Sequence, residues 1–391
     1  MKRVVVGLSG GVDSSVAAYL LKQEGYEVIG MFMKNWHDES VTISNDCPWI
    51  DDSNDALLIA NQLEIPFQVI DLSKEYYERI VSYMFSEYEK GRTPNPDVLC
   101  NREIKFDVFL KAALELGADF VATGHYCRKT TFESIHSLRA GIDNTKDQSY
   151  FLCQLNQEQL SKSLFPIGNL LKTEVRQIAE REGLITANKK DSQGLCFVGK
   201  ISLPTFLQQQ LSTKEGKIIE VPCNNKQLTE YHSVPVDLSN VKPLSTPFVF
   251  DEKDGVEVAK HIGAHYYTVG QRKGLHIGGR PSPSFVLQID TKNNIVFSGL
   301  NEDHKGLNRW CLKILKSDIH YVNSLFEFNL NEPRNIKIRT RYRQELQNAQ
   351  ALLLDDGLYV LFDKLQKAIT PGQFAAIYEE DELFCSGVIY S

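Results

Sequence analysis

The stretch Ser9–Ser15, which reads SGGVDSS, constrains the fold more than any other part of the chain. The apolar run Val4–Leu8 precedes it and predicts a short buried strand, and apolar side chains at helical spacing predict a helix over Ser14–Lys22. A strand, a tight glycine turn and a helix start form a cradle for an anion, because unpaired backbone amides and the helix dipole both attract negative charge. A capped helix in an ordinary α/β protein can show the same pattern.

The side chains of this loop suit a polyphosphate. The hydroxyls of Ser9, Ser14 and Ser15 can donate to phosphate oxygens, and Asp13 can hold a magnesium ion on them. The loop lacks the Gly-Lys-Ser/Thr ending of a P-loop and the GxGxxG pattern of a dinucleotide-binding fold. It resembles instead the pyrophosphate-binding loop of the ATP pyrophosphatases, enzymes that adenylate a substrate oxygen and release pyrophosphate.

The order of the predicted elements favours an α/β fold with a doubly wound parallel sheet, because strands alternate with helices over more than the first hundred residues. From about residue 206 the pattern changes to Val/Ile/Tyr/Phe runs with turns, which predicts β structure to the C-terminus. Asp290–Val296 reads as a hairpin with Asn-Asn in its turn. The turn-rich region 211–260 predicts irregular loops.

The composition limits the possible classes. The chain of 391 residues is 42% hydrophobic and 24% charged, as in ordinary globular proteins. We see no membrane span and no signal peptide, and we expect a cytoplasmic monomer. Eight cysteines without a CxxC pair argue against a zinc ribbon and against a disulfide scaffold. A net charge of −7 means that any contact with RNA needs a local basic patch.

The run Arg334–Arg343 is the best candidate for that patch, since no acidic residue interrupts it. As a strand it would place its basic side chains on one face, where they can meet phosphates. These are Lys337, Arg339, Arg341 and Arg343. The alternative is a solvated sheet face with a charged edge.

Two cysteines stand out by their surroundings. Cys100 follows a loop stiffened by two prolines and lies three residues after Asp97, and Cys196 follows a glycine in Asp191–Phe197. Two thiols that meet can carry a sulfur atom as a persulfide and then release it by forming a disulfide. Most free cysteines, however, are buried apolar side chains, and both interpretations stand at this point.

A series of motifs extends over nearly the entire chain. They are SGGVDSS, MKNW, TPNPDVLCN, TGHY, KDQSYFL, DSQGLCF, YTVGQRKGL, RYRQ and PGQ. In kind and order they resemble those of the bacterial-type tRNA-specific 2-thiouridylases. The resemblance implies ATP-dependent adenylation of the wobble uridine of tRNA, followed by sulfur transfer from a cysteine persulfide to give 2-thiouridine, AMP and pyrophosphate.

The resemblance also implies roles for individual residues. Cys196 would receive sulfur as a persulfide from a sulfur-carrier protein or a cysteine desulfurase, Cys100 would attack that persulfide, and Asp97 is a candidate general acid/base. Residues implied to contact ATP are Gly7, Leu8, Ser9, Gly10, Gly11, Val12, Asp13, Ser14, Met33 and Gly124. Residues implied to contact tRNA are Asn95, Pro96 and Asp97 at the target base, and His125, Lys146, Asp147, Gln148, Arg341, Tyr342 and Gln373 elsewhere.

The domain organisation follows from the same resemblance. We expect an ATP pyrophosphatase domain over residues 1–205, a small β-rich central domain over 206–290, and a C-terminal β-barrel that binds tRNA over 291–391. Between Phe206 and Tyr266 the family usually has a shorter segment, so this chain carries an insertion there.

Three alternatives remain open from the sequence. A synthetase of the same fold would transfer ammonia or an amino acid to a small molecule, and would leave both cysteine motifs idle. A non-enzymatic ATP-binding RNA module would not need either thiol. An iron–sulfur cluster held by Cys100 and Cys196 would replace the persulfide with metal-bound sulfide.

Overall fold

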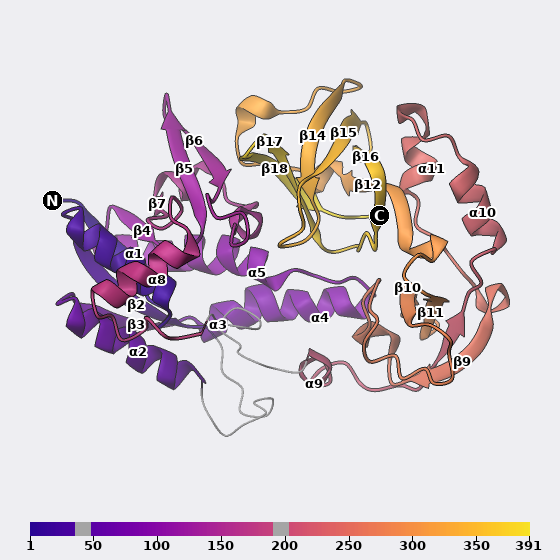
Figure 1. The fold of residues 1–391 in the computed structure, drawn as a ribbon, viewed down its shortest axis with the longest axis horizontal. Helices are drawn as coiled ribbons and strands as arrows, with labels where there is room; N and C mark the ends of the chain where they lie inside the picture. Colours follow the sequence, from indigo (N-terminus) through magenta and orange to yellow (C-terminus); the bar gives the residue numbers. More distant parts are fainter. Residues whose placement is uncertain (36–47, 191–202) are drawn as a thin grey trace.

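The computed structural model describes residues 1–35, 48–190 and 203–391. The described residues form three β-sheets, with five, four and nine strands. In Figure 1 the five-stranded sheet lies at one end of the molecule, the four-stranded sheet at the other, and the largest sheet between them. Within these ranges no helix has both the length and the apolar character needed to cross a membrane.

The five-stranded sheet is parallel throughout and has the order β3-β2-β1-β4-β7. Its strands are β1 (Arg3–Gly7), β2 (Glu27–Lys34), β3 (Phe67–Asp71), β4 (Phe120–Ala122) and β7 (Ser163–Leu164). The chain runs outward in one direction from β1 to β3 and in the other from β4 to β7. The strand order therefore reverses between β1 and β4, and open parallel sheets bind ligands beside such a point, at the carboxyl ends of the strands.

Helices cover both faces of this sheet. On one face, α1 (Val12–Gln23), α2 (Pro48–Gln62) and α8 (Lys172–Arg181) pack with the alternate strand residues Val4 and Val6. The prediction of a doubly wound parallel sheet is confirmed.

The other face packs around Val5 and two long, nearly continuous helical segments. The first consists of α3 (Ser73–Tyr76), η1 (Tyr77–Val81) and α4 (Ser82–Glu89), and the second of α5 (Pro96–Leu99), η2 (Cys100–Val108) and α6 (Phe109–Glu115). Figure 1 shows α4 extending beside the largest sheet toward the four-stranded sheet. Shorter helical turns are η3 (Ser149–Leu152), α7 (Gln157–Ser161), α9 (Leu203–Leu207), η4 (Leu238–Asn240), η5 (Glu252–Asp254), η6 (Ala264–Tyr266), η7 (Lys305–Leu307), η8 (Lys316–Asp318) and η9 (Ser324–Phe326).

The four-stranded sheet has the order β10-β11-β8-β9. Its strands are β8 (Gly216–Glu220), β9 (Val256–His261), β10 (Ser284–Asp290) and β11 (Ile295–Leu300). The hairpin predicted at Asp290–Val296 is confirmed, with Asn294 in the left-handed conformation at φ +57°. A domain boundary at 290/291 would separate the two paired strands of this hairpin. We propose instead that the middle unit continues to Leu300.

Regular structure also occupies the region 211–260, so the prediction of irregular loops there was wrong. Besides β8 and β9 it contains α10 (Lys226–Ser233) and α11 (Val241–Ser245). Each helix is short and buries only a few apolar residues, among them Leu228 on α10 and Leu244 on α11. A single turn or two of amphipathic pattern is too short to recognise in the sequence.

The largest sheet contains the predicted C-terminal β-barrel. Its strand order is β12-β16-β15-β14-β17-β18-β6-β5, and β13 also pairs with β18. The Tyr390 N–H donates to the carbonyl of Lys313 on β12, and the Lys313 N–H donates to the carbonyl of Ser391, both at 2.9 Å. These two bonds, just past β18, close the six barrel strands on themselves. The bounds are β12 (Asn308–Leu315), β13 (His320–Tyr321), β14 (Pro333–Arg339), β15 (Gln347–Leu354), β16 (Gly357–Lys367), β17 (Phe374–Glu379), β18 (Glu382–Val388), β5 (Cys127–Phe132) and β6 (Ile135–Ala140).

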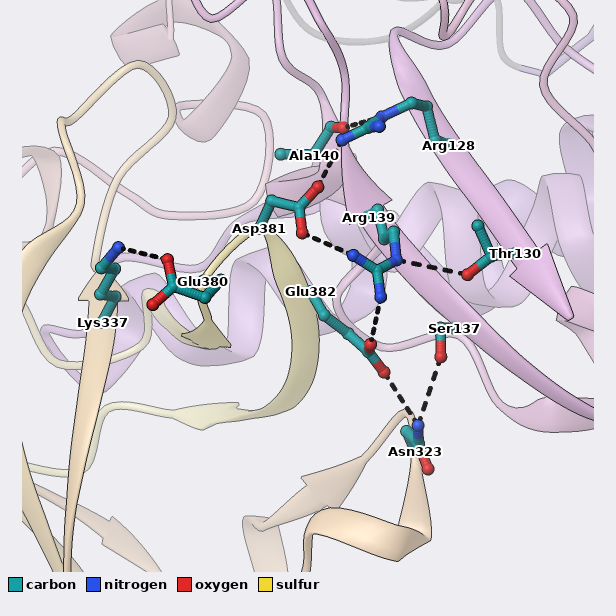
Figure 2. A network of polar contacts seen from close by, with 10 residues as sticks. All are labelled: Arg128, Thr130, Ser137, Arg139, Ala140, Asn323, Lys337, Glu380, Asp381 and Glu382. Carbon is teal, nitrogen blue, oxygen red and sulfur yellow. Dashed lines mark hydrogen bonds and ion pairs between the residues drawn. The ribbon is translucent and has the colours of Figure 1, made fainter. Parts of the chain in front are cut away.

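The β5–β6 hairpin joins the N-terminal part of the chain to the barrel. Arg139 on β6 pairs with Glu382 in the backbone register, and its guanidinium bonds Asp381 at 2.7 Å and Glu382 at 3.2 Å (Figure 2). Arg128 on β5 bonds the same Asp381, and Asn323 of the barrel donates to Glu382 at 2.9 Å. One continuous sheet and one charge network therefore hold the two parts in a fixed arrangement.

The basic run Arg334–Arg343 does not form the exposed strip that its sequence predicts. Strand β14 ends at Arg339, and the basic side chains along it are neutralised by acids from distant segments. Arg334 pairs with Glu379 at 2.8 Å and Lys337 with Glu380 at 3.1 Å. Arg339 is buried and pairs with Asp147 at 3.0 Å. The prediction failed because these acids lie next to β14 only in the folded chain.

The Arg339–Asp147 pair is the most deeply buried ion pair at this junction, with side chains 9% and 2% exposed. Asp147 also accepts bonds from the backbone N–H of Gly141 and Ser149 and from the Ser149 hydroxyl. We expect Arg339→Met to lower the free energy of unfolding by about 3–5 kcal/mol, because it leaves a buried carboxylate without its counter-ion. Urea unfolding followed by circular dichroism measures this loss.

The matched control is Lys337→Met on the same strand. Its partner Glu380 is 83% exposed, so the loss of this pair should change stability by less than about 1 kcal/mol. Equal effects of the two substitutions would contradict the role given to the buried pair.

Candidate active site

The glycine-rich loop lies where the strand order of the parallel sheet reverses, between the end of β1 and the start of α1. Gly10 has φ +70°, and a Cβ there would lie 2.3 Å from the backbone oxygen of Asp52, so only glycine fits. A Cβ on Gly11 would meet only the Ser9 hydroxyl, at 3.4 Å, within a 4 Å radius. The loop is thus closed on the Gly10 side and open at Gly11, as a cradle for an anion requires.

Hydroxyl groups fix the shape of this loop. Ser14 Oγ accepts from the Ser9 N–H at 3.1 Å and donates to the Gly11 carbonyl at 3.1 Å, and Ser15 Oγ donates to the same carbonyl at 2.8 Å. Leu8 and Val12 bury their side chains in the core on either side of the turn. These two residues therefore offer a ligand their backbone rather than their side chains.

The other residues predicted to contact ATP lie against this loop. Gly124 follows β4, and a Cβ there would lie 2.7 Å from the carbonyl carbon of Asp13 and 2.8 Å from the Ser14 nitrogen. A Cβ on Gly7 would lie 3.3 Å from the Cε of Met33, which is buried on β2. The fold thus brings together all the residues predicted for ATP, from three separate segments of the chain.

Asp13 is already engaged by two residues that sequence reasoning missed. Lys172 Nζ lies 2.7 and 2.8 Å from its two carboxylate oxygens, and Tyr126 Oη donates to Oδ1 at 2.7 Å. Lys172 is 159 residues away and begins α8, so no local pattern connects the two. The sequence did contain a signal for Tyr126, because this residue ends the TGHY motif.

The proline-rich loop leads directly into the helix that carries Cys100. Asn95 caps this helix, because its side-chain oxygen accepts from the N–H of Val98 at 3.2 Å, and Pro96 occupies the first turn. Asp97 is half-buried and lies three residues before Cys100, so both side chains lie on the same side of the helix. Cys100 is fully buried at the point where α5 passes into the π-helical stretch η2.

The barrel holds this loop from the other side. Gln373 Nε2 donates to the carbonyls of Thr93 and Pro94 at 3.0 and 3.2 Å, and its Oε1 accepts from Asn95 at 3.3 Å. The Thr93 N–H donates to the carbonyl of Pro371 at 2.9 Å. The PGQ motif therefore positions the loop that precedes Cys100.

His125 lies in the core behind Gly124, with 8% of its surface exposed. Its Nδ1 lies 2.7 Å from the Thr123 hydroxyl, and its ring packs against Phe106 and Phe165. Burial, and secondarily the charge of Lys105, hold the pKa of His125 well below its usual value. The imidazole is therefore neutral at physiological pH.

The remaining residues predicted to contact tRNA are divided between the interior and the surface. Gln148 accepts from the Tyr126 N–H at 3.0 Å, and Arg341 donates to the carbonyl of Ala368 at 2.5 Å. Tyr342 is half-buried, and its ring centroid lies 4.4 Å from that of Phe151. The Arg343 guanidinium lies 5.1 Å from the Tyr342 ring. Lys146 is half-buried, and Asp147 is the buried partner of Arg339 described above.

Cys196 and the whole motif Asp191–Phe197 lie outside the described residues, so the meeting of two thiols stays a prediction. Four other described cysteines are buried, and burial raises the pKa of each thiol: Cys127, Cys153, Cys311 and Cys385. Burial raises the pKa of Cys153 and of Cys311 to about 12. Across the described ranges, no group of three or more His, Cys, Asp or Glu side chains could hold a metal ion.

Family models of known proteins match three parts of the chain in the order of its three sheets. A family described as tRNA methyl transferase HUP domain matches residues 2–200. Its PRC-barrel domain matches residues 244–299, and an aminomethyltransferase β-barrel domain matches residues 312–389.

The full-length relatives carry a more specific name. A tRNA-specific 2-thiouridylase MnmA from Christiangramia forsetii is 60% identical, with 100% of each chain covered. The protein of the same name from Flavobacterium johnsoniae is 58% identical at the same coverage. The chain belongs to the tRNA-specific 2-thiouridylase family. A more distant member from Staphylococcus aureus is 42% identical and covers 99% of this chain and 95% of its own.

Some solved structures have a weak likeness to the chain. A 4-thiouridine synthetase–RNA complex with bound ATP is matched at 18% identity and a TM-score of 0.32, covering 54% of this chain and 50% of that chain. A likeness of this size says nothing about the site.

The tight approach at Gly124 gives a direct test of the loop. We expect Gly124→Ala to weaken ATP binding at least about tenfold, because a Cβ 2.7 Å from Asp13 must displace the start of α1. Equilibrium dialysis with labelled ATP measures the affinity. Gly278→Ala is the control, since a Cβ there meets nothing within 4 Å. Unchanged ATP affinity in Gly124→Ala would contradict the placement of the phosphates.

The environment of His125 predicts a pH dependence of stability. Because the pKa of His125 is lowered on folding, the unfolded chain takes up its proton first as the pH falls below about 6.5. This residue therefore costs up to about 1.4 kcal/mol of stability per pH unit below that value. We expect His125→Asn, which retains a polar atom near Thr123, to unfold with a weaker pH dependence between pH 6.5 and 5.

Urea titrations across this pH range measure the slope. The control is His276→Asn at an exposed position, which should leave the slope as in the unaltered protein. Equal slopes for His125→Asn and the unaltered protein would show that His125 is not held neutral.

Proposed function

We propose that this protein is a tRNA 2-thiouridylase. It adenylates the wobble uridine of tRNA with ATP and then replaces the activated oxygen with sulfur, releasing AMP and pyrophosphate. The full-length relatives at 60% and 58% identity are named for this activity. The glycine-rich loop at the switch point suits the pyrophosphate-releasing half of the reaction.

One observation supports the proposal more than any other: the carboxyl end of β2 reaches both the nucleotide loop and a buried thiol. Met33 contacts the position of Gly7, and two residues later the side-chain nitrogen of Asn35 lies 3.9 Å from Cys100 Sγ. A synthetase that transfers ammonia or an amino acid needs no thiol at this place. A sulfurtransferase does.

The chemistry requires both halves of such a site. A uracil carbonyl oxygen is a poor leaving group, and transfer of AMP converts it into a good one. The terminal sulfur of a persulfide on Cys196 then attacks the activated carbon, after Cys100 has attacked the persulfide to release that sulfur and form a disulfide. Asp97, on the same side of the helix as Cys100, serves as general acid/base. The target base must leave its stack to reach this site, which is easier in an anticodon loop than in a duplex.

Magnesium enters with the nucleotide in this proposal. Mg²⁺ is usually held by substrate phosphates and one or two carboxylates, and Asp13 is the carboxylate beside the loop. The ion would neutralise phosphate charge during adenylation. Since Lys172 bonds both oxygens of Asp13, the carboxylate must share or exchange this partner when the ion binds.

The partners follow from the same chemistry. The substrate is the anticodon loop of tRNA, and the sulfur comes from a carrier protein or a cysteine desulfurase. Arg341 and Tyr342 contact the RNA directly, whereas Asp147 and Gln373 hold the surfaces around it. Lys146 and Gln148 complete the set of tRNA contacts in this proposal, whereas His125, at 8% exposure, takes part only from the core. The protein acts as a cytoplasmic monomer in the same proposal.

The decisive experiment is a thiolation assay. Purified protein is incubated with unmodified tRNA, ATP, magnesium and a persulfide-generating desulfurase, and the nucleosides are analysed by mass spectrometry. We expect 2-thiouridine from the unaltered protein and at least a ~10³-fold lower rate from Cys100→Ser and from Cys196→Ser, because each thiol carries a separate bond-forming step.

Cys223→Ser is the control, since Cys223 is an exposed free cysteine of the middle unit. It should thiolate at the normal rate. Thiolation that survives loss of either Cys100 or Cys196 would exclude the two-cysteine mechanism. Release of AMP and pyrophosphate with a small acid or amide acceptor, without 2-thiouridine, would favour the synthetase.

A further inference from the structure

Lys172 places a positive charge at the mouth of the glycine-rich loop. It is the first residue of α8, and its ammonium lies 2.7 and 2.8 Å from the two oxygens of Asp13. Asp13 is itself the second residue of α1, next to the Gly10–Gly11 turn. A lysine that bonds Asp13 therefore lies within one side chain's length of any anion bound at the start of α1.

A second residue helps to orient this lysine. Tyr126 donates its hydroxyl proton to Asp13 Oδ1 at 2.7 Å, and Lys172 Nζ lies 5.7 Å from the centroid of the Tyr126 ring. Tyr126 belongs to the segment after β4, whereas Asp13 lies on α1 and Lys172 on α8. The three side chains thus connect three segments that meet where the strand order reverses.

Lys172 and Asp13 differ in burial, and the more exposed Asp13 is open to exchange of its partner. The Lys172 side chain is 10% exposed, whereas that of Asp13 is 31% exposed. A buried ion pair adds little to stability compared with an apolar pair of the same shape, so stability alone does not account for a lysine here. A carboxylate beside a polyphosphate site, by contrast, repels the ligand unless a cation neutralises it.

We propose that Lys172 binds the β- and γ-phosphates of ATP and stabilises the pyrophosphate as it leaves, and that Asp13 and Tyr126 position its ammonium for this task. This inference rests on the proposed use of ATP but not on tRNA thiolation. As the uridine oxygen bonds to the α-phosphorus, the bond from that phosphorus to the bridging oxygen breaks and its electron pair stays on pyrophosphate. Lys172 donates hydrogen bonds to this growing charge and keeps its protons.

The affinities for ATP, pyrophosphate and AMP distinguish a direct contact of Lys172 with phosphate from a purely structural role. AMP lacks the two phosphates that Lys172 contacts. In Lys172→Met we expect ATP and pyrophosphate to bind about 10–100-fold more weakly, the usual effect of losing a charged hydrogen bond, while AMP binding changes less than about twofold. Lys172→Arg should recover part of the loss. Isothermal titration calorimetry on the full chain without tRNA measures all three affinities.

Lys313→Met is the matched control. Lys313 also pairs with an aspartate, Asp356 at 2.5 Å, and its side chain is 15% exposed, but it lies on barrel strand β12. Its loss should leave all three affinities unchanged. If Lys172→Met weakens the binding of AMP and of ATP equally, Lys172 has a structural role. If all three affinities are unchanged, Lys172 is not part of the phosphate site. If the unaltered protein makes no 2-thiouridine, while Lys172→Met still loses pyrophosphate binding selectively, the thiolation proposal fails and this inference stands.

Discussion

The close approach of two backbone segments at the switch point of the parallel sheet governs the rest of the active site. Gly124, after β4, lies so near Asp13 and Ser14 that a single added carbon would overlap them. Because the segments touch, Tyr126 reaches Asp13, and Asp13 in turn meets Lys172 from α8. A looser contact would separate these groups and leave the helix start without a defined anion site. Backbone packing, rather than any one side chain, thus sets the geometry available to the phosphates.

The barrel contacts the candidate active site, in addition to its proposed role in binding RNA. Hairpin β5–β6 continues the barrel sheet, and Arg139 and Arg128 fix the joint through Asp381 (Figure 2). At a second point, Gln373 bonds the loop that leads to Cys100. Because the barrel contacts the N-terminal part of the chain at two separate places, it cannot rotate about either contact. A substitution in the barrel can therefore alter the chemistry of a thiol that it never touches.

The sequence predicted those parts of the site whose residues are neighbours in the chain. The strand–glycine–helix pattern around Ser9–Ser15 and the alternation of strands and helices are local signals. The bounds of β1 and α1 confirm the first, and the element order with its parallel sheet confirms the second. It could not predict Lys172 at Asp13, since 159 residues separate them. It also overestimated the free basic surface of β14, because Glu379 and Glu380 become neighbours only when β17 and β14 pair.

The pairing of these basic residues has a consequence for how an acidic protein can recognise RNA. Acidic partners within the protein neutralise Arg334, Lys337 and Arg339. Of the run 334–343, mainly the C-terminal end therefore remains available to RNA. There Tyr342 packs on Phe151 beneath the guanidinium of Arg343, which forms an aromatic and cationic surface at the barrel edge. Such surfaces stack on unpaired bases, whereas duplex binding relies on many phosphate contacts. This end of the run therefore favours an unpaired loop over a helix, in agreement with the proposed anticodon-loop substrate.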